Sequence, residues 1–392
     1  MGAGFELLRG AEALFPRVCQ EIAQARRRVW LETYLLHDDD ATRGLLQALG
    51  QAAQRGLDIR LLVDGFGGGA EVESLRPWLQ GMGVEVRVFR PRLSLWSPRA
   101  WRRLHRKLIL VDDDLLYVGG INLLSDWVDP NHGRLAAPRL DYAVRCHSTS
   151  LQAQAALVMA KTWWRTGLRA GWVAGEGRLR WQQLRRDLAA ARAPAKAGGS
   201  SARGVARLVF RDDLRQPRAI EREVARMLQG AKSEIRLAMA YFVPTRRLRK
   251  LLEQAAQRGV RVSVLIQGRT EYWWARWAEQ LLVQRLLSRG IEVWEYRESF
   301  LHAKVLVADD WATVGSSNWD PLSLWLAREA NLVLRSPRFA QQLSEDLGLH
   351  MVEPRAYRLS AASGVKDLVG LPSRMIQRLL LGLALALLRS LR

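Results

Sequence analysis

Leu104–Asp113 reads LHRKLILVDD, and further along the chain Leu301–Asp310 reads LHAKVLVADD. Both stretches have the pattern His, any residue, Lys, four residues, Asp. Lysine is scarce in this chain, because only seven of its 60 Lys plus Arg residues are Lys, and two of its six histidines lie in these stretches. A repeat of two rare residue types at one fixed spacing indicates a shared chemical task.

The repeat extends beyond these two stretches. QAAQRG occurs at Gln51–Gly56 and again at Gln254–Gly259, and a run of β-forming residues follows each copy. In each half, strand-like runs alternate with helical stretches, which predicts an α/β fold of two similar lobes, each a mixed β-sheet flanked by helices. The predicted boundaries are 1–190 for the first lobe, 191–204 for a flexible linker or loop, 205–360 for the second lobe and 361–392 for a C-terminal amphipathic segment.

The repeated motif suits phosphate chemistry. Residues two apart on a strand project to the same face, so His105 and Lys107 point together, as do His302 and Lys304. A lysine binds a phosphate oxygen, while a neutral imidazole can attack phosphorus or move a proton. The aspartates stand at an odd offset from each histidine. We therefore place Asp112 and Asp309 on the other face or at the turn, in a supporting role.

Small residues and an amide follow each motif. The first copy continues to GGIN at Gly119–Asn122 and the second to GSSN at Gly315–Asn318. Small residues let a phosphate approach the backbone, and an Asn amide or Ser hydroxyl can donate to its oxygens. One His-x-Lys on a strand is usually structural, but two copies with matching Gly and Asn favour a catalytic site.

These motifs resemble the phospholipase D superfamily, whose mark is a pair of His-x-Lys-x4-Asp motifs, each followed by Gly-Gly/Ser-x-Asn. The resemblance implies two phospholipase D-like lobes related by a pseudo-twofold axis, with both motifs meeting in one cleft. It explains the duplication, because one histidine attacks phosphorus while the other protonates the leaving alcohol.

Two further phrases narrow the resemblance. WATVGSSNWDPLSLWLAREANL and GAEALFPRVCQEIAQARRRVWLETYLL are similar to bacterial cardiolipin synthases of the type without N-terminal membrane spans. This implies a phosphatidyltransferase that makes cardiolipin from two phosphatidylglycerol molecules and releases glycerol. The family roles would make His105 the nucleophile of a phosphohistidine intermediate and His302 the general acid and then base, although the sequence itself does not say which histidine attacks first.

The resemblance also defines the remaining site residues. The candidate catalytic residues are His105, Lys107, Asp112, Asn122, His302, Lys304, Asp309 and Asn318, and the supporting residues are Ser316, Asp141 and Glu329. Asp141 and Glu329 match family positions that orient a histidine. The first motif has Gly120 where the second has Ser316, so that position offers at most a backbone N–H. We expect no metal and no cofactor, because lysines and asparagines supply the positive field.

Charge and apolar residues indicate the partner. The formal net charge of +21 favours a polyanion, which is nucleic acid or an anionic lipid surface. The C-terminal segment has an apolar run, Leu379–Leu388, bordered by arginines; it is too short to span a bilayer and suits its interface. We expect phosphatidylglycerol and cardiolipin as partners, no nucleic acid, and a peripheral position on the cytoplasmic face of the bacterial inner membrane.

Three other functions share some of these features. Water attacking the same intermediate would give a phospholipase D-type hydrolase. A superfamily nuclease would use the charge to follow a nucleic-acid backbone, but the apolar C-terminal segment and the many Trp residues oppose it. A noncatalytic lipid-binding protein would not need His, Lys and Asn intact in both copies. Glu32 and Tyr34 are on an early strand that could line the site, and the four other histidines, His37, His132, His147 and His350, are assigned structural roles.

Overall fold

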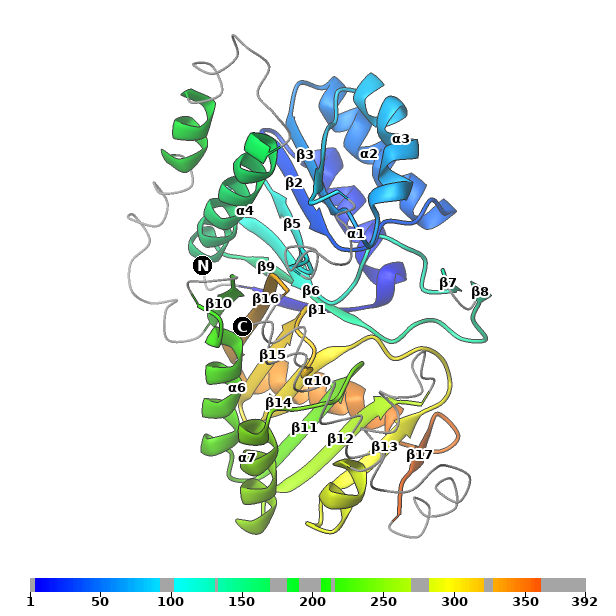
Figure 1. Cartoon of the computed structure of the whole chain (residues 1–392), viewed down its shortest axis with the longest axis vertical. Coiled ribbons are helices and arrows are strands. Elements are labelled where there is room, and N and C mark those ends of the chain that lie inside the picture. The colour runs from blue at the N-terminus through cyan, green and yellow to red at the C-terminus, as the bar shows by residue number, and fades with distance from the viewer. Residues whose placement is uncertain are drawn as a thin grey trace.

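The structure, a computed structural model, describes residues 4–91, 102–130, 133–169, 182–189, 206–212, 216–268, 282–320 and 327–360. It consists of two α/β lobes, one in the upper half of Figure 1 and one in the lower half. This confirms the predicted fold class. The predicted linker at 191–204 and the C-terminal segment at 361–392 lie outside the described residues.

The first lobe is built on a seven-stranded mixed sheet with the order β1-β9-β6-β5-β2-β3-β4. Its strands are β1 (Phe5–Arg9), β2 (Arg28–Thr33), β3 (Asp58–Asp64), β4 (Glu85–Phe89), β5 (Lys107–Val111), β6 (Leu115–Gly119) and β9 (Tyr142–His147). Its helices are α1 (Gly10–Gln24), α2 (Asp40–Gln54), α3 (Gly69–Gly81) and α4 (Thr149–Arg169). A small hairpin of β7 (Val128–Asp129) and β8 (Gly133–Arg134) extends from the lobe.

The second lobe has an eight-stranded sheet with the order β10-β16-β15-β14-β11-β12-β13-β17. Its strands are β10 (Ala206–Arg211), β11 (Glu234–Met239), β12 (Arg261–Gln267), β13 (Glu292–Tyr296), β14 (Lys304–Ala308), β15 (Trp311–Gly315), β16 (Glu329–Arg335) and β17 (Ala356–Arg358). The helices α6 (Ala219–Gly230), α7 (Arg246–Gln257) and α10 (Pro337–His350) pack around it.

The two sheets have the same strand order apart from β17, which is added at one edge. In each lobe three strands run parallel, and the motif strand, β5 or β14, lies antiparallel beside the first of them. The edge strands β1 and β10 are five and six residues long and contain both buried and exposed positions. They pair with β9 and β16, whose first residues adjoin the site.

The repeated QAAQRG has a structural cause. Gly56 and Gly259 follow the ends of α2 and α7 with φ of 87° and 85°, a left-handed conformation that glycine adopts at low cost. The arginine before each glycine donates to the carbonyl at the end of the preceding helix: Arg55 to Ile22 O at 2.7 Å and Arg258 to Leu228 O at 3.0 Å. This repeat therefore joins two helices and lies outside the catalytic chemistry.

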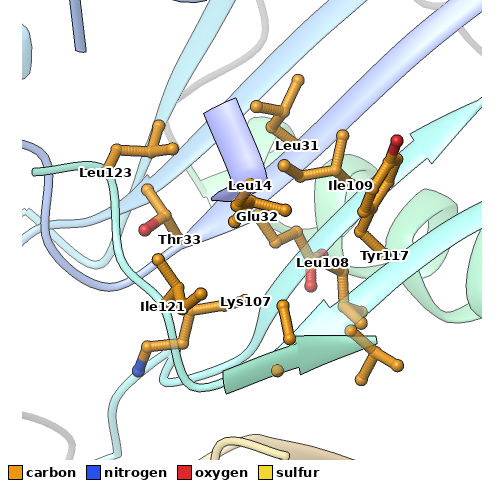
Figure 2. A pocket seen from close by; sticks show the side chains of 13 residues that line it. Leu14, Leu31, Glu32, Thr33, Lys107, Leu108, Ile109, Tyr117, Ile121 and Leu123 are labelled. Carbon is orange, nitrogen blue, oxygen red and sulfur yellow. The ribbon is translucent and has the colours of Figure 1, made fainter. Parts of the chain in front are cut away.

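A small pocket in the first lobe lies beside the motif strand. Leu14 of α1 and apolar side chains of β2, β5 and β6 form most of its lining, and Lys107 closes one side. Figure 2 shows the lysine nitrogen directed away from the apolar side chains. The lining supports the aliphatic stem of Lys107 while its charged end reaches out of the apolar region.

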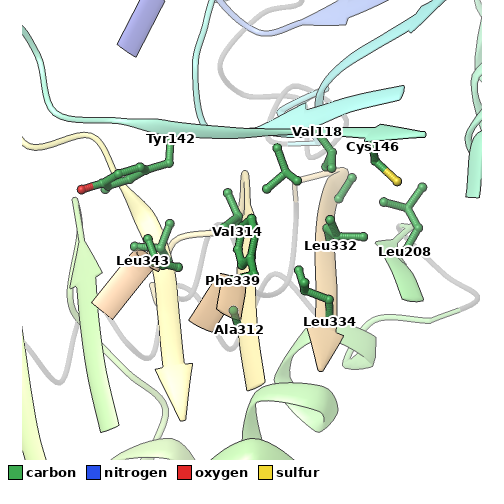
Figure 3. Close-up of a cluster of buried hydrophobic side chains, with 14 of the residues drawn as sticks. Val118, Tyr142, Cys146, Leu208, Ala312, Val314, Leu332, Leu334, Phe339 and Leu343 are labelled. Carbon is green, nitrogen blue, oxygen red and sulfur yellow. The ribbon is translucent and has the colours of Figure 1, made fainter. Parts of the chain in front are cut away.

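The two lobes share one hydrophobic core. Val118, Tyr142 and Cys146 of the first sheet face Val314 and Leu332 of the second (Figure 3), and these side chains belong to one buried cluster. The Tyr142 hydroxyl also donates to Asp346 of α10 at 2.6 Å. Because burial of apolar area is the main stabilising term, this core holds the lobes in one fixed relation.

Residues 182–189, which the sequence assigns to the first lobe, contact that lobe. Asp187 accepts a hydrogen bond from Arg60 at 2.7 Å, and the Arg60 guanidinium stacks on Trp30 at 4.4 Å. Within the described residues, no helix combines the length and the apolar content needed to cross a bilayer.

Candidate active site

Both motif histidines lie at the same edge of their sheets. His105 and His302 stand just before β5 and β14, where the neighbouring parallel strands end. The backbone N–H of His105 donates to Arg328 O at 2.9 Å, and that of His302 donates to Leu140 O at 2.8 Å. Each histidine segment therefore pairs with a backbone segment of the opposite lobe.

This pairing brings each histidine to a carboxylate of the other lobe. His105 Nδ1 lies 3.0 Å from Glu329 Oε1, and His302 Nδ1 lies 2.6 Å from Asp141 Oδ2. The resemblance implies that Asp141 and Glu329 orient a histidine, and the structure places each within hydrogen-bond distance of one imidazole. It adds that the pairs are exchanged between lobes, which strand patterns do not reveal. Both imidazoles keep about 14% of their side chain exposed and are reachable from solvent.

The hydrogen-bond contacts define the protonation of the two imidazole rings. His105 Nδ1 faces only acceptors, namely both Glu329 oxygens and Ser316 O, so this nitrogen carries the proton. Burial, opposed by Glu329, lowers the pKa of His105. Burial and the nearby lysines lower the pKa of His302 well below its usual value. In the neutral ring, Nε2 then has a free lone pair for attack or proton transfer.

Burial also raises the pKa of Asp141 to about 7, although Lys304 opposes the shift. The short His302–Asp141 contact makes these two groups a single proton-binding pair. Such a pair can hold one transferable proton near neutral pH, which is what a general acid requires.

Two buried lysines, one from each motif, bring positive charge to the histidines. Lys107 Nζ donates to His105 O at 2.9 Å, and Lys304 Nζ donates to His302 O. Burial lowers the pKa of Lys107 to about 7 and that of Lys304 to about 8. Glu329 and Asp141 oppose both shifts, so each lysine senses the carboxylates of both lobes. His105 Nδ1 also lies 3.1 Å from Ser316 O of the second motif, so the two motifs meet at one site.

The two asparagines differ in their surroundings. Asn122 Oδ1 accepts the N–H of Leu35 at 3.2 Å, which fixes the amide plane. The corresponding oxygen of Asn318 is buried and has no hydrogen-bond partner among the described residues. Both side chains lie at the start of the loop that follows β6 or β15, on the histidine edge of the sheet.

The small residues two positions before each asparagine adjoin the carboxylates. The Ser316 hydroxyl donates to Glu329. The Gly120 N–H donates to Tyr142 O at 2.9 Å. A Cβ at Gly120 would lie 2.2 Å from Asp141 Oδ1, so glycine is required for Asp141 to reach His302. Gly120 thus leaves room for Asp141 in the first lobe, whereas Ser316 donates to Glu329 in the second.

The motif aspartates do not join this cluster, which corrects their grouping with the catalytic residues. Asp112 and Asp309 lie at the far ends of β5 and β14, both at turns with φ of 50°. Asp112 accepts the backbone N–H groups of residues 26–28, and Asp309 those of residues 232–234. Each therefore anchors the chain that enters the first parallel strand, in agreement with the supporting role inferred from the odd spacing.

Of the two early-strand residues, Tyr34 reaches the site. Its ring meets the His105 ring edge-on at 4.9 Å between centroids, and Lys107 Nζ lies 5.5 Å from the ring. Glu32 instead pairs with the buried Arg106 at 2.9 Å. His37, His147 and His350 lie elsewhere, beside Glu71, Asp114 and Tyr296, and His132 is outside the described residues. In the described part of the chain, no cluster of His, Cys, Asp and Glu could hold a metal ion.

Two imidazoles in exchanged carboxylate pairs, with two buried lysines, define a duplicated phospholipase D-like enzyme that acts on a phosphodiester. A family model described as "Cardiolipin synthase, PLD-like domain" matches residues 18–136 and 224–350. Cardiolipin synthase B of Salmonella typhi is 35% identical over 360 residues, which cover 88% of this chain and 80% of that protein. Cardiolipin synthase B of Escherichia coli (strain K12) is 34% identical over the same shares.

Solved structures support the fold alone. Phosphatidylserine synthase of Haemophilus influenzae Rd KW20 superposes with a TM-score of 0.68 at 14% identity, over 97% of this chain and 92% of that chain. Polyphosphate kinase of Porphyromonas gingivalis gives a TM-score of 0.57 at 13% identity, over 96% and 53%. The chain belongs to the cardiolipin synthase family with a phospholipase D-like domain, and by class it is a phosphatidyltransferase.

Proposed function

We propose that the enzyme joins two phosphatidylglycerol molecules into cardiolipin and releases glycerol, through a phosphohistidine intermediate. The observation that carries this proposal is the exchange of carboxylates between lobes, which equips each histidine with a bound Nδ1–H and an available Nε2. The relatives named cardiolipin synthase B support the choice of substrates.

The reaction takes two displacements at one phosphorus atom. In the first, His105 Nε2 attacks phosphorus, the bond to the glycerol oxygen breaks, and the His302–Asp141 pair gives that oxygen its proton. In the second, the pair takes the proton from a hydroxyl of another phosphatidylglycerol, whose oxygen displaces His105. Lys107, Lys304 and the amides of Asn122 and Asn318 stabilise the negative oxygens in both transition states.

We assign His105 as the nucleophile because its partner differs from that of His302. Burial raises the pKa of Asp141 to about 7, which suits a pair that stores and returns a proton. Glu329 is held by the Ser316 hydroxyl and accepts from His105, an arrangement that fixes a ring for attack.

The substrates place the enzyme on a membrane. We propose peripheral binding to anionic phospholipid on the cytoplasmic face of the bacterial inner membrane. The net charge of +21 supports an anionic surface. Exposed apolar side chains supply a second argument: Leu349 lies in the last turn of α10 and Val352 just beyond its end, and they are 57% and 46% exposed. Arg355 donates to Leu349 O at 3.2 Å, so cationic and apolar groups adjoin there.

Hydrolysis is the second candidate, because both histidines are partly exposed and water can reach the same intermediate. Purified protein incubated with labelled phosphatidylglycerol vesicles separates the outcomes. Cardiolipin with released glycerol supports transfer, whereas phosphatidic acid as the sole lipid product supports a phospholipase D-type hydrolase.

We expect His105→Ala and His302→Ala to abolish turnover, and only His302→Ala to retain a trappable acid-labile phosphohistidine. Full activity in either variant would contradict the two-histidine mechanism.

A further inference from the structure

The residue that ends the middle parallel strand differs between the lobes. Asp64 ends β3 and Gln267 ends β12, and the following glycine donates to the neighbouring strand in both lobes, Gly65 to Phe89 O and Gly268 to Tyr296 O. The two positions are therefore equivalent. Neither belongs to the repeated motif, and each reaches the residue that precedes a catalytic histidine.

The contacts themselves have opposite polarity. Asp64 Oδ2 accepts the N–H of Leu104 at 2.7 Å, whereas Gln267 Nε2 donates to the carbonyl of Leu301 at 3.2 Å. Both side chains are buried. We propose that Asp64 is a positioning residue for His105 and that Gln267 is the positioning residue for His302. The proposal rests on the proposed function for its kinetic consequences only.

Asp64 needs both of its carboxylate oxygens. Oδ2 accepts from Leu104, while Oδ1 accepts from Phe66 N at 2.9 Å and Gly67 N at 3.3 Å. Arg103 Nη1 lies 3.8 Å from Oδ1 and adds a positive charge. An asparagine has one acceptor oxygen and one donor group, so it cannot satisfy both sides. Asp64→Asn would set an NH2 group against a backbone N–H without creating a cavity.

Asp126 offers a matched control. It is buried like Asp64, and burial raises the pKa of both carboxyls to about 6. Asp126, however, accepts from Ala11 N and Glu12 N with Oδ2 alone. Asp126→Asn can keep both bonds through its one carbonyl oxygen. Both substitutions therefore change a buried carboxylate into an amide, and they differ in whether one oxygen or two must accept.

The test combines kinetics on phosphatidylglycerol vesicles with hydrogen exchange of the full chain. We expect Asp64→Asn to lower kcat about 10²-fold with KM nearly unchanged, because a small displacement of a reacting group costs that much. Asp126→Asn should stay within about threefold of the unmodified enzyme, a factor of roughly 0.7 kcal/mol or less in barrier height. Exchange should accelerate in residues 102–108 of Asp64→Asn and stay unchanged in residues 299–305.

If Asp64→Asn does not fold, Gln267→Glu provides the equivalent hydrogen-exchange measurement in the second lobe. It removes the donor to Leu301 O, and we expect faster exchange in residues 299–305 with residues 102–108 unchanged. Equal kcat for Asp64→Asn and Asp126→Asn with unaltered exchange, or a Gln267→Glu protein with unaltered exchange, would overturn the proposal. Exchange is read without substrate, so an unmodified enzyme that makes no cardiolipin would refute the proposed function and leave this test intact.

Discussion

His105 Nδ1 lies 3.0 Å from Glu329 Oε1, so the first lobe's histidine is completed by a carboxylate of the second lobe. The reverse holds for His302 and Asp141 at 2.6 Å. Neither lobe contains a complete catalytic pair. The shared core around Tyr142 and Leu332 therefore does more than stabilise the fold, because it also fixes the relative position of the two residues in each pair.

The exchanged pairs lead to a prediction for Glu329→Gln. The amide keeps the size of the side chain but removes the charge that stabilises the imidazolium and fixes its tautomer. We expect kcat to fall by about 10²-fold or more, with an unchanged melting temperature. Steady-state kinetics on phosphatidylglycerol vesicles measures the effect. Ser316→Ala, which removes only the hydroxyl donor to Glu329, should lose less, and activity of Glu329→Gln equal to the unmodified enzyme would contradict the orienting role.

The position of Asp112 leads to a prediction about stability. Its carboxylate accepts three backbone N–H groups at the far end of β5, away from the histidines. We expect Asp112→Ala to lower the free energy of unfolding by about 2–4 kcal/mol, because several backbone donors lose a charged acceptor. kcat of the folded fraction should change less than threefold. Denaturant unfolding and kinetics at low temperature test both parts, and a 10²-fold loss of kcat without destabilisation would return Asp112 to the catalytic set.

The buried lysines predict a coupling between protons and anions. Burial lowers the pKa of Lys107 to about 7 and that of Lys304 to about 8, so at about pH 8 both are partly neutral in the free enzyme. A bound anion favours the ammonium form and raises both pKa values. Binding should therefore take up protons, and affinity should fall as the pH rises from about 7 to 9.

Sulfate is a suitable probe for this coupling because it does not titrate in this range. Calorimetry of sulfate binding at about pH 8, in two buffers with different ionisation enthalpies, should give a positive proton uptake. Lys107→Met should reduce both the uptake and the affinity. The same variant should be stabilised in the free state near pH 7, because the unfolded lysine is fully protonated there whereas burial disfavours the proton in the folded state, and that gain should shrink toward pH 10. Binding heats that are independent of the buffer would contradict the coupling.

The sequence was sufficient for the main features because the determinants are local. Period-two alternation around His105 and Lys107 defines the motif strand, and the second copy defines the duplicated lobes. The odd spacing to Asp112 indicated a turn, where the structure places it. Glycine at 120 could be identified as a small residue, but the reason for it, the approach of Asp141, requires three dimensions.

Other features depend on contacts between segments far apart in the chain. The exchange of Asp141 and Glu329 between lobes follows from how the sheets pack, and no spacing in the sequence encodes it. Asp64 and Gln267 belong to no repeated motif and differ from each other, so a comparison of the two halves of the sequence does not identify them. The buried Arg106 stands between His and Lys of the motif, and only the structure reveals its partner, Glu32.

The exposed end of α10 predicts where the enzyme touches a membrane. His350 packs against Tyr296 at 5.9 Å, and Tyr296 ends β13 at the sheet edge where His302 precedes β14, so Leu349 and Val352 adjoin the catalytic edge of the second lobe. We expect Leu349→Glu with Val352→Glu to weaken binding to vesicles that contain phosphatidylglycerol by tenfold or more, because burial of an aliphatic side chain contributes roughly 1.5–3 kcal/mol. Trp78→Glu is the control, since this exposed residue lies on α3, at the other end of the molecule from β17 (Figure 1). Vesicle co-sedimentation gives the affinities.

Turnover of a short-chain, monomeric phosphatidylglycerol should be unchanged in all variants, because this substrate does not require binding to a vesicle. Equal losses of vesicle binding in the double variant and in Trp78→Glu would show that added negative charge, and not this patch, causes the effect.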